Sequence, residues 1–393
     1  MKRLGCAVIT LILALTALIP PVRAEEPEYP AKAYVLMDAA TGTVLKAYNE
    51  HEALPPASVT KVMTLLLIME AVDSGQIKWT DTVTASEAAA AKGGSQVYLK
   101  VGENMTVEEM VKSIAVSSAN DCACAMAEHL AGSETAFVEK MNARAAALGM
   151  KDTHFVNCTG LDDGADASAH RTSAYDIALM SRELLTKHPD IKKFTTIWMD
   201  SVRDGAFGLS NTNKLVRFYP GCTGLKTGYT SGAGHCLSAS ALRDGMELIA
   251  VVLGCGSSAD RFAACKSMLD YGFANYALFS VPSPESSVAV KMGVSNQISV
   301  VPQSTGSLLV EKGMLTDINI RTALPDQITA PVEKGQVIGE ITVLRGDEVL
   351  TRIPLTAAEN MERLSWLDLF LQLLGRIAMA GQNALSESPK PDG

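Results

Sequence analysis

The chain has 393 residues, of which 47% are hydrophobic and 20% are charged, so it carries enough apolar material for a full-sized core. An intrinsically disordered chain and a small disulfide-stapled scaffold are therefore excluded. The 43 acidic and 34 basic residues give a net charge of −9, and the sequence has no dense Lys/Arg run, which argues against nucleic acid as a partner. The length predicts two domains, one large and one small.

The first 24 residues have the pattern of an export signal. Lys2 and Arg3 precede an apolar run over residues 6–19, and Val22-Arg23-Ala24 places small residues at the −3 and −1 positions of a cleavage site. The run is shorter than the roughly 20 residues that span a bilayer. We predict that residues 1–24 are a cleaved signal peptide, with an uncleaved anchor as the alternative. The mature chain would then act outside the cytoplasmic membrane.

The cysteines and histidines favour neither a disulfide framework nor a metal site. Without Cys6 the chain keeps seven cysteines, an odd number, and it has no C-x-x-C motif. Cys122 and Cys124 are two residues apart, which places them on different faces of a helix. We interpret the cysteines as small buried apolar residues. The six histidines form no H-x-H or H-x-x-x-H pair, so the sequence predicts no metal.

The first part of the mature chain reads as a hairpin followed by helices. Short apolar stretches at 33–37 and 43–47 flank a Gly-containing turn and predict a β-hairpin. A dense apolar run that starts at Ser58 and ends near Gly75 predicts a buried central helix. The remaining helices that the pattern predicts in this part are 86–92, 106–117, 121–131, 134–148 and 173–187. Thr106 and Glu109 have the spacing of a capping box.

Strand patterns replace helical ones after residue 225. The stretches 235–241 and 246–253 flank Asp244-Gly245, a strong hairpin signal, and a helix is predicted at 261–273. Hairpins around a helical middle predict an α+β domain with an antiparallel sheet over residues 25–278.

The rest of the chain changes in composition. Short apolar runs between Gly, Pro and Asp predict a small all-β domain at 283–356. A last helix is predicted at 358–381, and the polar segment 382–393 is predicted to be a disordered tail.

Ser58 and Lys61 form the single S-x-x-K of the chain, at the start of the predicted central helix. The i, i+3 spacing puts the hydroxyl and the amine on one helix face. A serine is a weak nucleophile that needs a base, and a buried lysine near another cation becomes neutral enough to serve. The helix N-terminus adds N–H groups suited to an oxyanion. Taken alone, this pattern favours a helix N-cap beside a solvated lysine.

Two further motifs occur once each. Ser118-Ala119-Asn120 lies between two predicted helices, where it would otherwise be a helix cap. Lys226-Thr227-Gly228 stands just before the predicted hairpin strands, where a glycine allows a ligand to approach the strand edge and where the alternative is a simple turn.

The ordered triple S-x-x-K, S-x-N and K-T-G resembles that of the penicillin-recognising serine enzymes. Within them, the chain resembles the serine-type D-Ala-D-Ala carboxypeptidases, the low-molecular-weight penicillin-binding proteins of peptidase family S11. The resemblance is close over about residues 31–278 and extends in architecture to the β domain and the last helix. It implies a β-lactamase/transpeptidase-like domain. The segments that carry the resemblance are 57–61, 93–96, 117–121 and 224–230.

The resemblance implies an acyl-enzyme mechanism that needs no cofactor. Ser58 would attack the carbonyl between the last two D-alanines of a peptidoglycan stem peptide, and Lys61 would accept its proton. Ser118 would relay a proton to the leaving D-alanine, while Asn120 would orient the substrate and Lys61. The backbone N–H groups of Ser58 and Tyr229 would form the oxyanion hole. β-Lactam antibiotics would act as covalent inhibitors at the same serine.

The terminal carboxylate of the substrate would bind at the K-T-G segment. Lys226 and Thr227 would engage it, with Gly228 and Tyr229 lining the edge of the site. Lys226 would also keep the site electropositive and so help Lys61 to stay neutral. Members of the family use an arginine beyond the following strand, and Arg261 is the matching residue, with a solvated helix arginine as the alternative.

Three rival functions share parts of this pattern. A class A β-lactamase needs a deacylating glutamate between S-x-N and K-T-G, and none of the four glutamates in that interval is followed by an asparagine four residues later. Such an enzyme also ends soon after K-T-G, whereas 165 residues follow Gly228 here. A D,D-transpeptidase with the same nucleophile differs only in its acceptor. A catalytically silent penicillin-binding wall protein is disfavoured because every motif position is intact. The four glutamates are Glu128, Glu134, Glu139 and Glu183.

The segment 358–381 predicts a helix that lies on a membrane surface. Large apolar side chains recur at helical spacing and face a narrow polar stripe. Asp368 and Gln372 interrupt the apolar run, which disfavours a transmembrane span and favours an interfacial helix. The alternative is that the apolar face packs on the β domain. The apolar residues are Trp366, Leu367, Phe370, Leu373, Leu374 and Ile377.

Overall fold

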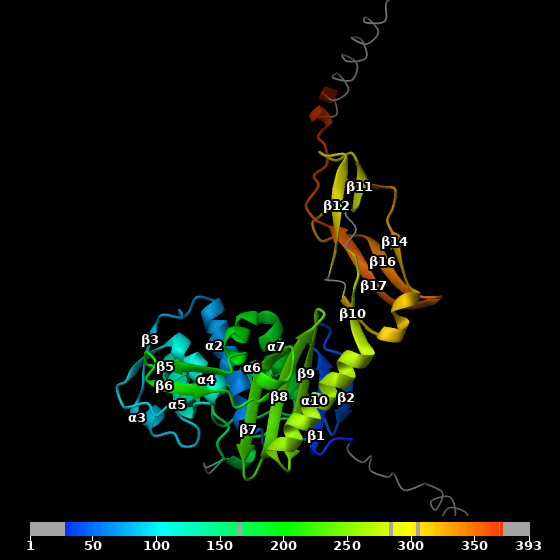
Figure 1. Ribbon diagram of the computed structural model, residues 1–393. Coiled ribbons are helices and arrows are strands. Elements are labelled where there is room, and N and C mark those ends of the chain that lie inside the picture. The colour runs from blue at the N-terminus through cyan, green and yellow to red at the C-terminus, as the bar shows by residue number, and fades with distance from the viewer. Residues whose placement is uncertain (1–27, 163–166, 283–285, 304–306, 369, 372–393) are drawn as a thin grey trace, which may run out of the picture.

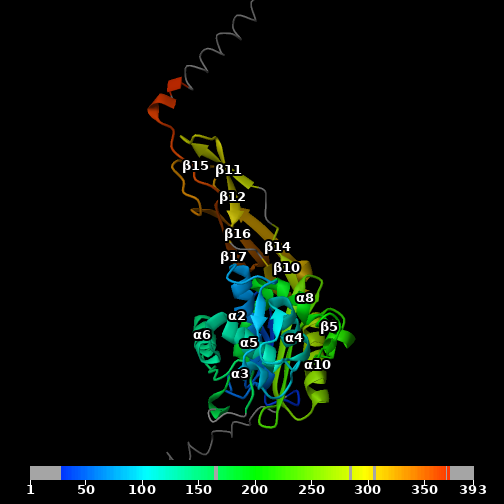
Figure 2. The same ribbon diagram turned by 90° about the vertical axis from the view of Figure 1, so that its left-hand side faces the viewer.

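The computed structural model of the protein describes residues 28–162, 167–282, 286–303, 307–368 and 370–371. They form two units stacked end to end, a larger one of sheet and helices and a smaller one of strands (Figure 1, Figure 2). The predicted signal peptide and the predicted tail lie outside the described residues.

A five-stranded sheet forms the centre of the larger unit. Its strands run in the order β2-β1-β9-β8-β7, and every neighbouring pair is antiparallel. The predicted hairpins at the start of the fold and around Asp244-Gly245 are confirmed. The strands are β1 Ala33–Asp38, β2 Val44–Tyr48, β7 Cys222–Thr230, β8 Gly234–Arg243 and β9 Met246–Cys255.

Helices cover both faces of this sheet. All six residues of β1 are buried, because Val35 and Met37 face the main helical layer while Tyr34 and Leu36 face α10 (Ser258–Asn275). A strand covered on both sides reads as a continuous apolar run rather than an alternating one. In Figure 1, α10 lies across the face of the sheet opposite α2 (Lys61–Asp73) and α7 (Ala174–Lys187).

The helical layer contains the predicted helices with small shifts at their ends. Thr106 caps its helix as predicted: its Oγ1 accepts from the Glu109 N–H at 3.2 Å, and the Glu109 carboxylate accepts from the Thr106 N–H at 3.1 Å. The predicted helix at 86–92 is a single turn, α3. The longer helices are α2 Lys61–Asp73, α4 Val107–Ser117, α5 Asn120–Ala131, α6 Glu134–Ala147 and α7 Ala174–Lys187. The short elements are η1 Ala57–Thr60, β3 Thr82–Thr84, α3 Glu87–Ala90, β4 Asn104–Thr106, η2 Ala167–Ala169, η3 Pro189–Ile191, α8 Lys192–Thr195, β5 Met199–Val202, β6 Phe207–Ser210 and α9 Leu215–Phe218.

The smaller unit is all-β, as predicted. Six of its strands form a sheet in the order β14-β16-β17-β12-β11-β15, and β10 pairs with β13. The Lys312 amine donates to the Phe273 carbonyl of α10 at 2.7 Å, which ties the two units together. The elements are β10 Tyr276–Ser280, β11 Ser286–Lys291, β12 Gln297–Pro302, β13 Ser307–Glu311, η4 Lys312–Asp317, β14 Ile318–Ala323, β15 Gln327–Thr329, β16 Val337–Arg345 and β17 Glu348–Ala357.

The predicted start of the last helix at residue 358 is wrong. Met361 forms a β-bridge with Val332, and Arg363 forms one with Gly293. These backbone pairings hold the segment against the β domain, so helical residues begin only at Trp366. Residues 369 and 372–381 of the predicted helix lie outside the described residues. Within the described ranges, no helix is long and apolar enough to cross a membrane.

Candidate active site

Ser58 and Lys61 meet at the junction of a 3-10 turn and a helix. Ser58 lies in η1 and Lys61 is the first residue of α2. The Lys61 amine donates to the Ser58 Oγ at 2.9 Å and to the Thr159 carbonyl at 2.8 Å. The hydroxyl and the amine therefore face each other as the i, i+3 spacing predicts.

Two glycines allow the backbone to close around this turn. A Cβ on Gly160, whose φ is +81°, would stand 1.9 Å from the Ala57 carbonyl oxygen. A Cβ on Gly228 would stand 2.6 Å from the Pro56 carbonyl oxygen and 3.1 Å from the Ser58 nitrogen. Ala57 itself has a φ of +48°, a strained value for a residue with a side chain. The turn that carries Ser58 is thus held between the 157–161 loop and strand β7.

The K-T-G segment lies within a strand rather than before the hairpin. Lys226, Thr227 and Gly228 belong to β7, which is the edge strand of the central sheet. Lys226 donates to the Thr227 carbonyl at 2.9 Å, and the Thr227 hydroxyl donates to the Thr212 hydroxyl at 2.6 Å. Because Gly228 has no side chain, the backbone around Ser58 lies close to it. The sequence predicts that a ligand approaches this glycine closely, but here the protein's own backbone does so.

The two motif lysines are both almost fully buried. Lys61 is 0% exposed and Lys226 is 1% exposed. Burial lowers the pKa of Lys61 from 10.5 to about 7, although the nearby Cys158 and Asp121 act in the opposite direction. Burial also lowers the pKa of Lys226, and the charges of Lys61 and Arg261 lower it further. An amine beside Ser58 is therefore available in its neutral form near pH 7.

The S-x-N motif forms the connection between α4 and α5. Ser118 caps α4 in the left-handed region with a φ of +64°, and it is buried. Asn120 starts α5, and its Nδ2 donates to the Gly93 carbonyl at 2.7 Å. Its Oδ1 is buried without a hydrogen-bond partner among the described residues. That oxygen can accept a hydrogen bond from a bound molecule.

Arg261 and Tyr229 both lie next to Gly228, but the arginine is buried and the tyrosine is exposed. Arg261 is 8% exposed, and its Nη1 donates to the carbonyls of Gly228 at 2.8 Å and Cys236 at 3.3 Å. The alternative of a solvated helix arginine is therefore wrong. Tyr229 is exposed, and its ring stacks on His235 with centroids 4.4 Å apart.

Several site residues escaped the sequence analysis. Thr159 contributes only its carbonyl, and Gly160 only its lack of a side chain, so neither residue type signals a role. The Asp121 carboxylate accepts from the N–H groups of Val97 and Leu99 and fixes the segment after Gly93-Gly94. An acidic residue at the first turn of a predicted helix was the only signal for that contact.

His170 is another residue that was missed, and it supports the turn that carries Ser58. Its Nδ1 accepts from the Val156 N–H at 3.1 Å, so its Nε2 carries the proton and donates to the Thr60 Oγ1 at 2.7 Å. Burial lowers the pKa of His170 to about 4, which keeps the ring neutral. Thr60 in turn donates to the Ala57 carbonyl at 2.9 Å.

Comparison with known proteins decides the family. Residues 21–257 match the profile of the D-alanyl-D-alanine carboxypeptidases, peptidase S11. The chain belongs to this family. Residues 273–363 match the C-terminal domain of penicillin-binding protein 5. The S11 resemblance, the serine peptidase class and the D,D-carboxypeptidase function that the sequence predicted are confirmed.

Relatives of the family align along nearly the whole chain. The D-alanyl-D-alanine carboxypeptidase DacF of Bacillus subtilis is 43% identical, over 90% of this chain and 91% of its own length. The structure of penicillin-binding protein 5 from Haemophilus influenzae is 30% identical, with a TM-score of 0.74 over 87% of this chain and 100% of that one. An ampicillin-bound penicillin-binding protein D2 from Listeria monocytogenes is 29% identical, with a TM-score of 0.55 over 63% of this chain and 100% of that one.

The described part of the chain contains neither a cluster of metal ligands nor a disulfide. Among the residues that the structure describes, no three His, Cys, Asp or Glu residues gather in a way that would hold a metal ion. All the described cysteines are free, and all but Cys222 are buried.

Gly160→Ala should disable the S11 site. The new methyl group would clash with the Ala57 carbonyl and displace the Ser58 turn, and a displacement of about 1 Å is enough to slow chemistry roughly 100-fold. We expect that loss in the rate of covalent labelling by a fluorescent penicillin. Gly149→Ala is the matched control, because Gly149 has a similar φ of +74° but open space around its Cα. Equal labelling rates for the two variants would contradict the steric argument.

Lys61→Met should raise thermal stability at pH 7 while it slows acylation about 100-fold or more. The amine has a pKa of about 7 in the folded protein against an ordinary 10.5. Between these values the unfolded chain binds a proton that the folded chain does not, so folding around the amine costs on the order of 4 kcal/mol at pH 7. The cost shrinks as the pH rises toward 10.5. The Tm advantage of the variant, measured by calorimetry, should fall from pH 7 to pH 10, and a constant advantage would contradict a lowered pKa.

Proposed function

We propose that Ser58 is the nucleophile and Lys61 its general base in a D,D-carboxypeptidase reaction on peptidoglycan stem peptides. The observation that carries this is the 2.9 Å contact between the Ser58 Oγ and a fully buried amine. The serine oxygen forms an ester with the carbonyl carbon of the penultimate D-alanine, and the C–N bond to the last D-alanine breaks. Water then hydrolyses the ester and regenerates Ser58.

The proton of Ser58 passes through Lys61 and Ser118 to the leaving amine. Ser118 is buried at the connection between α4 and α5, and Asn120 starts α5 with a buried, unpartnered Oδ1 among the described residues. That oxygen suits the amide N–H of a bound peptide or the Lys61 amine. The arrangement supports roles for Ser118 as proton relay and for Asn120 as an orienting group.

The terminal carboxylate of the substrate binds at the β7 edge. Lys226 and Thr227 supply a cation and a hydroxyl there, and Arg261 reaches the same strand through the Gly228 carbonyl. An incoming carboxylate stabilises the charged form of Lys226, which leaves Lys61 as the neutral member of the pair. Because Gly228 brings β7 next to the Ser58 nitrogen, the N–H groups of Ser58 and Tyr229 are suited to the oxyanion.

The structure gives a β-lactamase no deacylating carboxylate at the serine. Among the described residues, Glu134 pairs with Lys92 and Glu183 with Arg144, and no glutamate contacts Ser58 or Lys61. The acyl-enzyme formed with a β-lactam is therefore expected to persist, and β-lactams act as covalent inhibitors. The ampicillin-bound penicillin-binding protein D2 of Listeria monocytogenes supports this expectation.

The C-terminal helix attaches the enzyme to the outer face of the cytoplasmic membrane. Trp366, Leu367, Phe370 and Leu371 are all exposed, Trp366 to 75%. Exposed large apolar side chains on a helix beyond the β domain are costly in water and favourable in a lipid interface, at roughly 1.5–3 kcal/mol each before ordering costs. With residues 1–24 as a signal peptide, the site would face the cell wall.

Ser58→Ala should abolish the release of free D-alanine from diacetyl-Lys-D-Ala-D-Ala and all labelling by penicillin, because the variant lacks the hydroxyl oxygen that forms the ester. Ser74→Ala, at the far end of the same helix, should retain both. Labelling of the Ser58→Ala protein would refute the assignment.

Addition of an amine acceptor in the same assay separates hydrolysis from transpeptidation, since a transpeptidase would yield more exchanged peptide than free acid.

Removal of the chain beyond residue 365 should abolish sedimentation with anionic liposomes and leave activity unchanged. The cut keeps Met361 and Arg363, whose bridges hold the end of the β domain. The full mature chain is the positive control, and Trp366→Ser with Phe370→Ser is a gentler variant that should bind less. If the full chain stays in the supernatant, the membrane proposal is wrong.

A further inference from the structure

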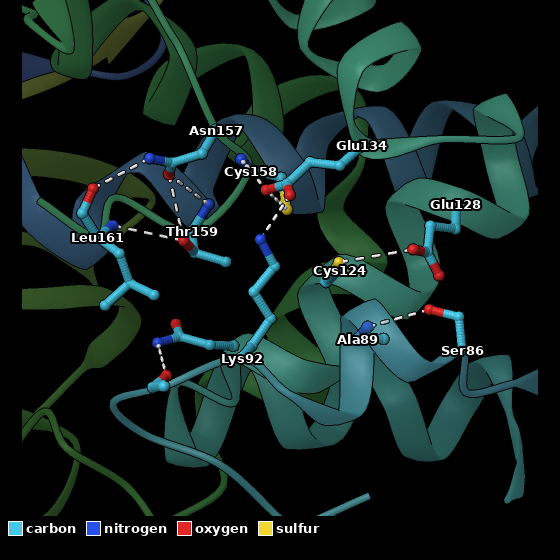
Figure 3. A network of polar contacts seen from close by, with 12 residues as sticks. Ser86, Ala89, Lys92, Cys124, Glu128, Glu134, Asn157, Cys158, Thr159 and Leu161 are labelled. Atoms are coloured by element: carbon cyan, nitrogen blue, oxygen red, sulfur yellow. Dashed lines mark hydrogen bonds and ion pairs between the residues drawn. The ribbon is translucent and has the colours of Figure 1, made fainter. Parts of the chain in front are cut away.

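The carboxylate of Glu134 joins two loops that border the site. Glu134 is the first residue of α6, and its Oε1 accepts from the backbone N–H and from the thiol of Cys158, each at 3.2 Å. Its Oε2 pairs with the Lys92 amine at 2.5 Å. Figure 3 shows the side chains of Lys92 and Glu134 pointing toward each other beside Cys158.

Each of these loops presents a backbone carbonyl to a motif side chain. Cys158 precedes Thr159, whose carbonyl accepts from the Lys61 amine at 2.8 Å. Lys92 precedes Gly93, whose carbonyl accepts from the Asn120 Nδ2 at 2.7 Å. Lys92 is therefore next to one of these carbonyls in the sequence, and Glu134 is hydrogen-bonded to the residue next to the other.

The pair is well shielded from water. The side chains of Lys92 and Glu134 are 23% and 21% exposed. Burial opposes the charge on each, yet the hydrogen bond between them raises the pKa of Lys92 and lowers that of Glu134, so both stay charged at neutral pH. A shielded pair is screened less than a surface pair, and loss of one partner leaves the other as a buried, uncompensated charge.

The charged side chain of Glu134 connects the 157–161 loop to the start of α6. The Asn157 Oδ1 accepts from the N–H groups of Thr159 at 3.1 Å and Gly160 at 2.6 Å. Those bonds shape the turn internally. The Thr64 hydroxyl of α2 donates to the Cys158 carbonyl at 2.7 Å, and the N–H and thiol of the same residue donate to Glu134 at the start of α6, so Cys158 connects the loop to both helices.

We propose that Lys92 and Glu134 are positioning residues whose ion pair holds the two loops against Lys61 and Asn120 and keeps water from the Lys61 amine. This rests on the roles proposed above for Lys61 and Asn120. When the pair is broken, the Thr159 carbonyl moves away and water reaches the amine. Lys61 then holds its proton more tightly, and acylation of Ser58 requires a higher pH.

The residues that supply the other groups facing the Lys61 amine are not substituted in this test. They are Lys226 from β7, Asp121 from α5, the Cys158 thiol from the loop and His170 from the segment before α7. A shifted pH profile in a Lys92 or Glu134 variant therefore reports the hydration of Lys61 rather than the loss of a neighbouring charge in direct contact with it.

The experiment measures the rate of acylation by a fluorescent penicillin as a function of pH. Lys92→Met keeps the aliphatic stem and removes the cation, and Glu134→Gln keeps an acceptor for Cys158 and removes the anion. Both should acylate about fivefold more slowly at pH 7, with the half-maximal pH raised by about 1. Lys92→Arg keeps the charge and should stay within about twofold of the parent.

A second ion pair on α6 provides the control. Arg144 and Glu70 are 2.6 Å apart with side chains 25% and 28% exposed, so their distance and burial resemble those of Lys92 and Glu134. Glu70→Gln should lower thermal stability without moving the pH profile, because neither residue adjoins a motif loop. A change in Tm alone is thus separated from a change in positioning.

Alkylation of Cys158 by iodoacetamide, followed by peptide mass spectrometry, reports the loop independently of activity. The thiol is buried against Glu134, so alkylation should be faster in Lys92→Met than in the parent and unchanged in Glu70→Gln. If Lys92→Met shows the parent's pH profile and the parent's Cys158 protection, the positioning proposal is overturned. Even then, penicillin labelling that is present in the parent and lost in Ser58→Ala would still support the proposed function.

Discussion

The burial of two lysine amines side by side is the constraint on which the site depends. Water would keep both Lys61 and Lys226 protonated, and a protonated Lys61 has no capacity to act as a base. Excluding water requires the backbone to close tightly around the Ser58 turn, and this is possible only because Gly160 and Gly228 have no side chains to obstruct it. Strain at Ala57 and the desolvation of two amines both destabilise the fold, and both occur beside Ser58, the proposed nucleophile.

The rest of the catalytic unit can be understood as the frame that delivers these groups. The central helix α2 is apolar on most faces and packs inside the helical layer, so Lys61 at its start has little freedom to move. The edge strand β7 brings Lys226 from the other side, held in register by β8. The α4–α5 connection closes the third side with Ser118 and Asn120. The packing of the sheet and the helices thus brings together three elements that are far apart in the sequence.

Sequence reasoning succeeded where residue type and spacing carry the information. The i, i+3 geometry of Ser58 and Lys61, the capping box at Thr106 and the hairpin at Asp244-Gly245 are local, and each has a fixed chemical signature. It failed where the backbone acts. The Thr159 carbonyl could belong to any residue, and the strand that holds Lys226 was hidden because a covered edge strand with two glycines lacks simple alternation. The late start of the last helix depends on bridges from Met361 and Arg363 to residues far away in the sequence, which no local pattern reports.

The contact between Gly228 and the Ser58 nitrogen also limits how this enzyme can evolve. Codon changes at Gly228 that add even one carbon atom would press on the backbone of Ser58, the proposed nucleophile. Lineages under antibiotic selection therefore have little room for adaptive change at this inner surface. Heritable variation that lowers drug affinity but spares growth is more accessible at the outer rim, where Tyr229 is exposed and its side chain makes no contact that the turn requires. The inner wall of the site would then remain nearly constant while the rim diverges among descendants.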